Sequence, residues 1–301
     1  MQALAAFILQ GTWQAVMLLV VTALLPLLNL VGGAALALVT LRKGPQEGLL
    51  ILLISTCVLL VLAMGLFNST LPVIVMVSAC WLPLWILAGV LRYSISLTVT
   101  LQAALVLALL CVLGCTLAIG DVAGWGRQLL DRLLAPLLQQ MQLAGEQRSA
   151  IEATLAPLLL GLFVGNALLS TLLSLLLGRW WQSLLFYPGG FGTEFRSLRL
   201  GRWPAWLMLG LFAGIWLWQW PVLANLLPPL LVLYVLQGIA VVHGVVNQAK
   251  LAQGWLVGLY VVLLLLPQTL LLLGLLGTVD AWVDIRARIA ARLEPSNHLR
   301  S

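Results

Sequence analysis

Charged side chains are scarce in this sequence. Asp, Glu, Lys and Arg make up 8% of the 301 residues, whereas a soluble domain carries about 25%. Hydrophobic residues make up 62%. This composition excludes an ordinary soluble domain, and it leaves few titratable groups that could be positioned for acid–base catalysis.

Cysteine and histidine are also few, with four and two residues. The cysteines lie within apolar stretches, unlike the disulfide framework of a secreted domain, and Cys111 and Cys115 share a helix face without any His or acid that could complete a metal site. The glycine-rich stretch 188–192 lacks the Gly-Lys-Ser/Thr ending of a nucleotide loop. We therefore expect no metal, no cofactor and no catalytic residues.

What the sequence has instead is long charge-free runs. A helix needs ~20 apolar residues to cross a hydrocarbon core of ~30 Å, and in lipid its backbone hydrogen bonds must close internally. The sequence thus predicts an all-α, polytopic transmembrane bundle of eight or nine membrane helices, with the first run broken near Pro26 and its first helix retained rather than cleaved. The runs, of which the fifth contains His243, are residues 3–41, 49–91, 93–120, 153–178, 203–249 and 251–279.

The most basic internal segment is 179–202. Its arginines (Arg179, Arg196, Arg199 and Arg202) against one glutamate predict a cytoplasmic loop. Because the other basic residues also lie at the ends of apolar runs, the net charge of +6 reflects membrane topology, not a nucleic-acid partner. Strict alternation of the helices puts the C-terminal tail outside, whereas a shallow hairpin at Pro267 keeps it inside; we favour the inside tail.

Segment 121–152 differs from the apolar runs. Its leucines and Met141 recur at helical spacing, with polar residues opposite, which predicts an amphipathic interfacial helix with a bend at Pro136. We divide the chain into an N-terminal membrane bundle (1–178) that includes this segment, the basic cytoplasmic loop (179–202), and C-terminal membrane helices with a tail (203–301).

Four segments resemble a known family. LRKGPQEG at 41–48, FYPGGFGTEFRSLRL at 186–200, LQGIAVVHGVV at 236–246 and LLGTVDAWVDIRARI at 275–289 resemble the YybS-like bacterial membrane proteins in their gammaproteobacterial form. The N-terminal part of that family looks like the S components of energy-coupling-factor vitamin transporters. The resemblance implies a bacterial inner-membrane protein of the transport class, without naming ligand residues.

Polar side chains inside apolar runs are the candidates for a ligand site. Asn166, Ser170 and Ser174 follow an i, i+4, i+8 pattern that is typical of helix packing but could line a cavity. Gln10 and Gln14 lie one turn apart, and Gln237 and His243 share a later helix. In the tail, Asp280, Asp284 and Arg288 are spaced one turn apart, which predicts ion pairs within a helix. The candidate ligand residues are Gln10, Gln14, Asn166, Ser170, Ser174, Gln237 and His243.

Two functions remain open. The first is binding and transport of a small solute in the manner of an S component, capped by segment 121–152 and energised by a partner protein. The second is a non-transport scaffold or assembly factor in the bilayer that docks an envelope or membrane partner through Arg179, Arg196, Arg199 and Arg202, residues that could equally meet lipid phosphates. We do not expect an enzyme, because His243 has no acid within helical reach.

Overall fold

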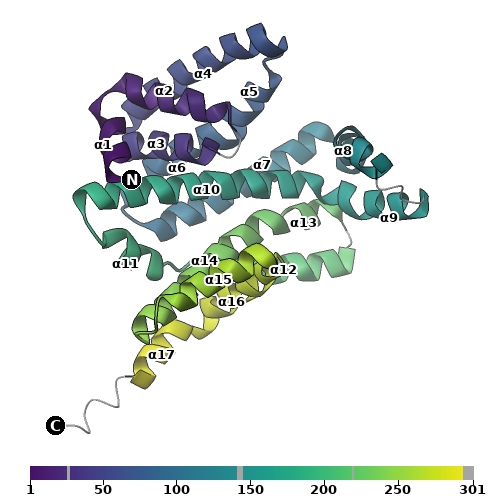
Figure 1. Cartoon of the computed structure of the whole chain (residues 1–301). Coiled ribbons are helices and arrows are strands. Elements are labelled where there is room, and N and C mark those ends of the chain that lie inside the picture. The colour runs from purple at the N-terminus through teal and green to yellow at the C-terminus, as the bar shows by residue number, and fades with distance from the viewer. Residues whose placement is uncertain (26–27, 141–144, 219, 294–301) are drawn as a thin grey trace, which may run out of the picture.

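The computed structural model describes residues 1–25, 28–140, 145–218 and 220–293, apart from the side chains of 67, 133–140, 146–148 and 293. Within these ranges the chain is helical and contains no strand (Figure 1). The predicted all-α bundle is confirmed. The break expected at Pro26 and the position of Met141 lie outside the described residues, as do Glu294 and Arg300 of the tail.

An N-terminal group of helices surrounds α3 (Asn29–Arg42). Residues 32–41 of α3 are all buried, because the helix is apolar on every side and carries small residues that let its neighbours approach. Gly11 separates α1 from α2, and the two helices meet at a bend of 119°, which the uniformly apolar sequence does not predict. The other members are α1 (Gln2–Gln10), α2 (Thr12–Ala23), α4 (Pro45–Phe67), α5 (Leu71–Met76), a π-helical turn (Val77–Trp81) and α6 (Leu82–Ser94).

Helix α10 (Leu159–Phe186) runs through the middle of the molecule, between the N-terminal group and the C-terminal helices (Figure 1). Small residues make both contacts. A side chain at Gly178 would lie 2.7 Å from the carbonyl of Ala34 on α3, and one at Gly161 would lie 2.4 Å from the carbonyl of Asn225. Gly161 and Gly178 thus let neighbouring backbones approach α10, as small residues do in membrane helices.

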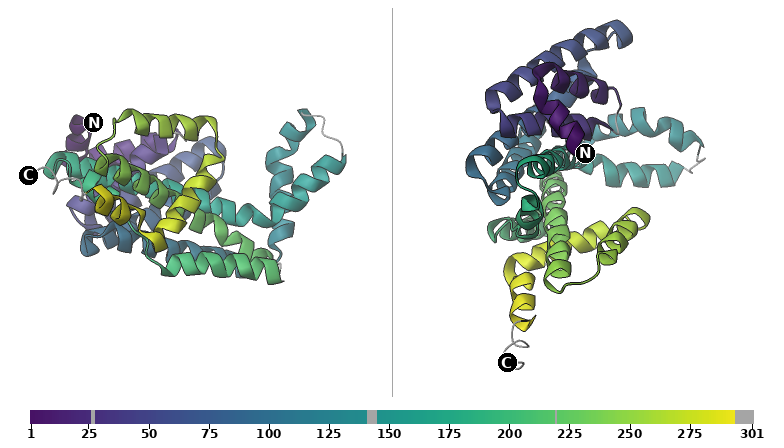
Figure 2. Two further views of the ribbon diagram at one scale, coloured as in Figure 1. Left: turned by 90° about the horizontal axis from the view of Figure 1, so that it is seen from below. Right: turned by 60° about the vertical axis from the view of Figure 1, so that its left-hand side comes forward.

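Helix α7 (Leu97–Ile119) leads to the amphipathic segment, which forms α8 (Val122–Gln140) and α9 (Gly145–Leu155), followed by a 3₁₀ turn (Ala156–Leu158). Both views in Figure 2 show α8 and α9 extending away from the other helices. The segment was expected to cap the bundle. Its described contacts are instead with the 3₁₀ turn and the adjoining ends of α7 and α10.

The C-terminal helices pack around α14. Gly274 of α16 faces Leu231 of α14, and Gly277 of α16 faces Tyr234 of α14, so α14 and α16 run parallel to each other. Helix α15 connects them along the chain. Gly244 of α14 faces Arg286 of α17. The chain breaks around Pro267, as predicted. These elements are α11 (Gly190–Arg196), α12 (Trp203–Trp218), α13 (Pro221–Asn225), α14 (Leu227–Gln248), α15 (Gly254–Leu265), α16 (Thr269–Val283) and α17 (Ile285–Leu293).

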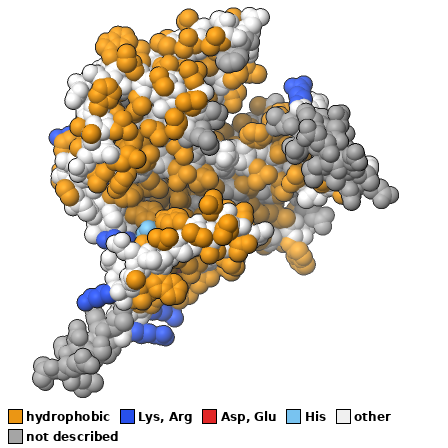
Figure 3. Space-filling view, in the orientation of Figure 1, with side chains coloured by type: hydrophobic (Ala, Val, Ile, Leu, Met, Phe, Trp, Pro, Cys, Tyr) orange, Lys and Arg blue, Asp and Glu red, His pale blue; other side chains and the backbone are white. Residues whose placement is uncertain are grey.

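Five described helices are long and apolar enough to cross a membrane, or six if the bent pair α1–α2 is one span. Helices α3, α12, α15 and α16 are apolar but shorter, so the number eight or nine stays a prediction. No residue of α15 is buried, and hydrophobic side chains cover most of the surface in Figure 3. Such a surface is stable in lipid and not in water, which makes the chain a membrane protein.

One end of the bundle gathers the basic residues. Arg92 at the end of α6 donates to the carbonyls of Leu41 and Arg42, and the Arg42 guanidinium lies 4.0 Å from the centre of the Phe186 ring at the end of α10. Helix α17 reaches the same end, because Arg286 contacts the loop after α11. We call this the basic end; α17 lies here, as the inside-tail alternative requires, and Figure 3 shows Lys and Arg side chains near it.

Candidate functional site

The loop between α11 and α12 is built into the protein interior. Leu198 and Leu200 are buried, at 2% and 0% exposure, so the backbone polar groups beside them need protein partners. The Gln237 side chain of α14 accepts a hydrogen bond from the Leu200 N–H at 2.9 Å, and the Gln102 amide of α7 donates to the Leu200 carbonyl at 2.7 Å. Two helices thus fix one loop residue.

A buried ion pair completes this attachment. The Arg286 guanidinium (2% exposed) donates to the carbonyls of Arg196 at 2.6 Å and Leu198 at 2.9 Å, and it lies 2.8 Å from the Asp280 carboxylate (3% exposed). The Ile285 N–H and the Gln237 amide also donate to Asp280. Hydrogen bonds to both partners are what make a buried ion pair tolerable in a low-dielectric interior.

A second ion pair lies nearer the surface. Arg199 donates to both oxygens of Asp284, at 2.5 and 2.6 Å, and the two side chains are 50% and 36% exposed. Asp284 has a φ of 50° and separates α16 from α17. We refer to Arg199, Gln237, Asp280, Asp284 and Arg286 together as the loop clamp, because they tie the loop to α14, α16 and α17.

The clamp corrects the interpretation of the tail. The acids were expected to pair within one helix, Asp284 with Arg288. Instead Asp284 pairs with Arg199, 85 residues earlier, and Asp280 on α16 pairs with Arg286 on α17. Ending α16 at Asp284 turns α17 back toward Asp280, and periodicity within a continuous helix cannot predict that turn.

The four loop arginines have different environments. Arg179 lies within α10, which continues to Phe186, and it bonds to Glu194 at 3.0 Å and to Gln182 at 2.6 Å. Arg199 belongs to the clamp. Arg196 is half-buried and makes no hydrogen bond or ion pair with its side chain in the described part of the chain, and Arg202 is exposed. Two of the four predicted docking residues are therefore engaged internally, and two are free to bind something else.

The candidate ligand residues do not form one site. Ser174 is buried at the contact of α10 with Gly33 of α3, Gln237 belongs to the clamp, and the His243 Nε2 atom lies 2.9 Å from the Tyr260 hydroxyl. Asn166 and Gln10 are exposed, while Ser170 and Gln14 are half-exposed. No hydrogen bond within the described ranges joins two of the seven.

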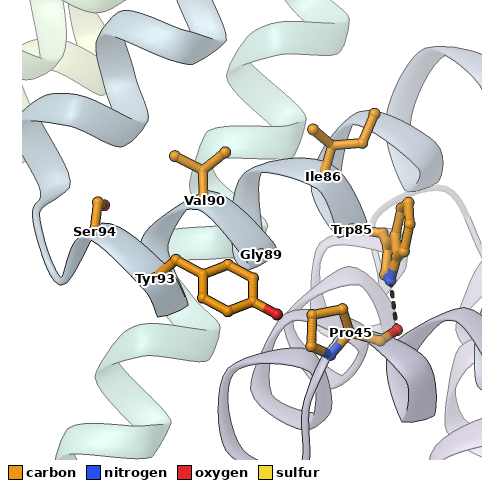
Figure 4. A pocket seen from close by; sticks show the side chains of 7 residues that line it. All are labelled: Pro45, Trp85, Ile86, Gly89, Val90, Tyr93 and Ser94. Atoms are coloured by element: carbon orange, nitrogen blue, oxygen red, sulfur yellow. Dashed lines mark hydrogen bonds between the residues drawn. The ribbon is translucent and has the colours of Figure 1, made fainter.

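A hollow of about 650 Å³ lies between the start of α4 and the second half of α6. The Trp85 indole N–H donates to the Pro45 carbonyl at 2.8 Å, and the Tyr93 ring points toward the same proline (Figure 4). Apart from Ser94 and the Tyr93 hydroxyl, its lining side chains are apolar, and the N–H of Trp85 is already used in this hydrogen bond. The hollow therefore suits an apolar lipid chain. Its lining does not bring together the several polar groups that a solute site needs.

The described residues include no group of three or more His, Cys, Asp or Glu that could hold a metal ion. Comparison of the chain with protein-family models, curated proteins and solved structures finds no match. The YybS-like resemblance therefore stays a prediction.

The exposed half of the clamp predicts a defined pH response. Burial acts to raise the pKa of the Asp284 carboxyl, but the Ala287 N–H, the Arg199 guanidinium and the charge of Arg286 outweigh it and lower the pKa below its ordinary value of 3.8. Stabilisation from this pair is therefore complete above pH 3.8 and is lost as the pH falls through the lower, folded-state pKa.

Asp284→Asn should accordingly cost about 1 kcal/mol or less, because the pair is partly exposed. Asparagine tolerates the left-handed backbone at this position. Unfolding midpoints measured against pH should differ from the wild type by a constant amount at neutral and mildly acidic pH, and should converge only in strong acid. A difference that changes near neutral pH would contradict this assignment.

Proposed function

We propose that the protein is a non-transport membrane scaffold that docks an acidic partner protein at its basic end. The observation that carries the proposal is that the loop clamp, together with Gln102 of α7, holds the loop in one conformation. A loop fixed in this way presents its exposed Arg202 at a set position, which lowers the entropic cost of binding a partner.

The charge at the basic end supports an acidic partner. Glu194, Asp280 and Asp284 are each already paired with an arginine, whereas Arg202 and Arg288 are exposed. The acids neutralise the arginines that they pair with, so the unpaired, exposed arginines leave the surface positive. A positive surface steers and orients negatively charged partners. By the positive-inside rule this end faces the cytoplasm, in keeping with the bacterial inner membrane.

Small-solute binding in the manner of an S component is the second candidate, and one observation favours it. Asn166 is exposed and Ser170 half-exposed on α10, within an apolar span. A polar side chain at membrane depth that faces outward is costly unless something satisfies it. The other candidate residues lie elsewhere and add nothing to this position.

Native mass spectrometry of the detergent-purified chain tests both candidates. We expect a stoichiometric protein partner, which the charge-reversed pair Arg202→Glu and Arg288→Glu loses because reversed charges repel acidic groups. Arg127→Glu on α8 is the matched control, since that exposed arginine lies on a different part of the molecule. Loss of the partner in both variants, or in neither, contradicts the proposed docking surface. A small molecule retained by the wild type and lost in Asn166→Ala with Ser170→Ala would instead favour solute binding.

A further inference from the structure

A groove of about 410 Å³ lies at the basic end, between α11, α14 and α17. Its walls carry three arginines and several neutral polar side chains, and no carboxylate of the described residues lines it. The residues that matter for its chemistry are Thr193, Arg196, Arg199, Asn247, Gln248 and Arg286. The groove is separate from the exposed side chains of Arg202 and Arg288 on which the proposed docking depends.

Two of these arginines retain unused hydrogen-bonding capacity. The Nε atom of Arg286 is buried and has no hydrogen-bond partner, although both of its terminal nitrogens are engaged. Arg196 is half-buried, and its guanidinium bonds to no described residue. Because the Arg286 Nε atom is itself closed off, the guanidinium of Arg196 is the free arginine donor that lines the groove.

Close packing directs Arg286 toward the groove. A side chain at position 244 would lie 2.9 Å from the Cδ atom of Arg286 and 3.4 Å from the Arg196 carbonyl. Only glycine at this position of α14 lets the Arg286 chain pass so near the helix. The arginine is therefore held at the groove wall by the same contacts that place it in the clamp.

The charges around the groove favour an anion. Asp280 and Asp284 are not among the lining residues and pair with Arg286 and Arg199. Three lining arginines thus meet two carboxylates, and one positive charge is left uncompensated. Asn247 and Gln248 are exposed and add neutral amide donors. An anion with several acceptor atoms in different directions fits donors placed on three helices.

We infer that this groove binds a phosphate group, carried either by a membrane phospholipid or by a soluble phosphate compound. Phosphate oxygens accept hydrogen bonds from several directions at once, and guanidinium groups are the protein side chains best suited to them. A volume of about 410 Å³ exceeds what one phosphate fills, so the groove also accommodates part of the molecule that carries it.

The test compares Arg196→Gln with Arg202→Gln. Both variants remove one arginine from the basic end, but Arg196 lines the groove and Arg202 does not. Delipidated full-length protein is titrated with inorganic phosphate by calorimetry. In parallel, protein extracted from phosphatidylglycerol nanodiscs is weighed by native mass spectrometry to count retained phospholipid. The first arm reports a soluble source of phosphate, and the second reports a lipid source.

We expect at least one arm to show binding that Arg196→Gln weakens ~10-fold or more, the size of one lost charge-assisted hydrogen bond, while Arg202→Gln stays near the wild type. Asn247→Ala, an exposed groove residue outside the clamp, should weaken the same arm without altering the unfolding midpoint. Equal losses in Arg196→Gln and Arg202→Gln would indicate general attraction to a basic surface and overturn the inference. Absence of binding in both arms would overturn it as well, whatever the result of the partner experiment.

Discussion

Replacing Arg286 with methionine should lower the free energy of unfolding by about 3–5 kcal/mol, the cost of removing one partner from a buried ion pair. The substitution leaves the Asp280 carboxylate in the interior with only the Gln237 amide and the Ile285 N–H. It also removes the donors to the carbonyls of Arg196 and Leu198. The loss should appear as a lower unfolding midpoint in detergent and as faster trypsin cleavage at Arg199 and Arg202.

Arg288→Met is the matched control, because Arg288 lies two residues further along α17 but is exposed. Its midpoint should stay within about 0.5 kcal/mol of the wild type, as for most surface substitutions. Adding Asp280→Leu to Arg286→Met should recover part of the lost stability, since replacing a whole buried pair by apolar residues is often neutral. If Arg286→Met and Arg288→Met unfold alike, the clamp does not contribute as described.

Replacing Gly277 with alanine should cost about 1–3 kcal/mol, the usual penalty for overpacking a well-packed contact. A methyl group there would lie 2.1 Å from the Tyr234 carbonyl oxygen and 2.9 Å from the Gly238 backbone nitrogen. Both are backbone atoms, so relief requires α14 and α16 to move apart. That movement also separates Gln237 from the Gly277 carbonyl, to which it donates at 2.9 Å.

Gly258→Ala on α15 provides the comparison, because a methyl group at that position meets no other atom within 4 Å. Unfolding midpoints in one detergent should fall for Gly277→Ala and stay near the wild type for Gly258→Ala. Gly277→Ala should also increase trypsin cleavage at Arg199, since the loop is held from α14. Equal midpoints for the two variants would mean that the α14–α16 contact is looser than its geometry indicates.

The helices themselves could be predicted, because long charge-free runs permit few other structures in lipid. The break around Pro267 also falls where the proline predicts it. The bend at Gly11 could not be predicted, since an apolar helix with one glycine is often straight. The extension of α10 past Arg179 was also missed, because that arginine is satisfied by Gln182 and Glu194 and does not end the helix.

The site was predicted only in its parts. Gln237 and Arg199 stood out as polar groups beside apolar runs, but their partners lie 37 to 85 residues away along the chain. Spacing rules report on neighbours one or two turns apart, so they assigned the tail acids to the wrong partners. Asn166, Ser170 and Ser174 share a spacing, yet only Ser174 is buried, because α3 covers just one part of α10.

The position of Arg286 near the C-terminus has a consequence for biosynthesis. Ribosomes make the loop long before they make Arg286, which follows the Arg196 carbonyl by 90 residues. Until then the carbonyls of Arg196 and Leu198 have no guanidinium to bind, and the loop remains open to proteases. Because parts of a protein fold as the chain emerges, a chain truncated before Ile285 should form its earlier helices while its loop stays accessible to proteases. Attachment of the loop to the interior therefore has to wait for the synthesis of α17.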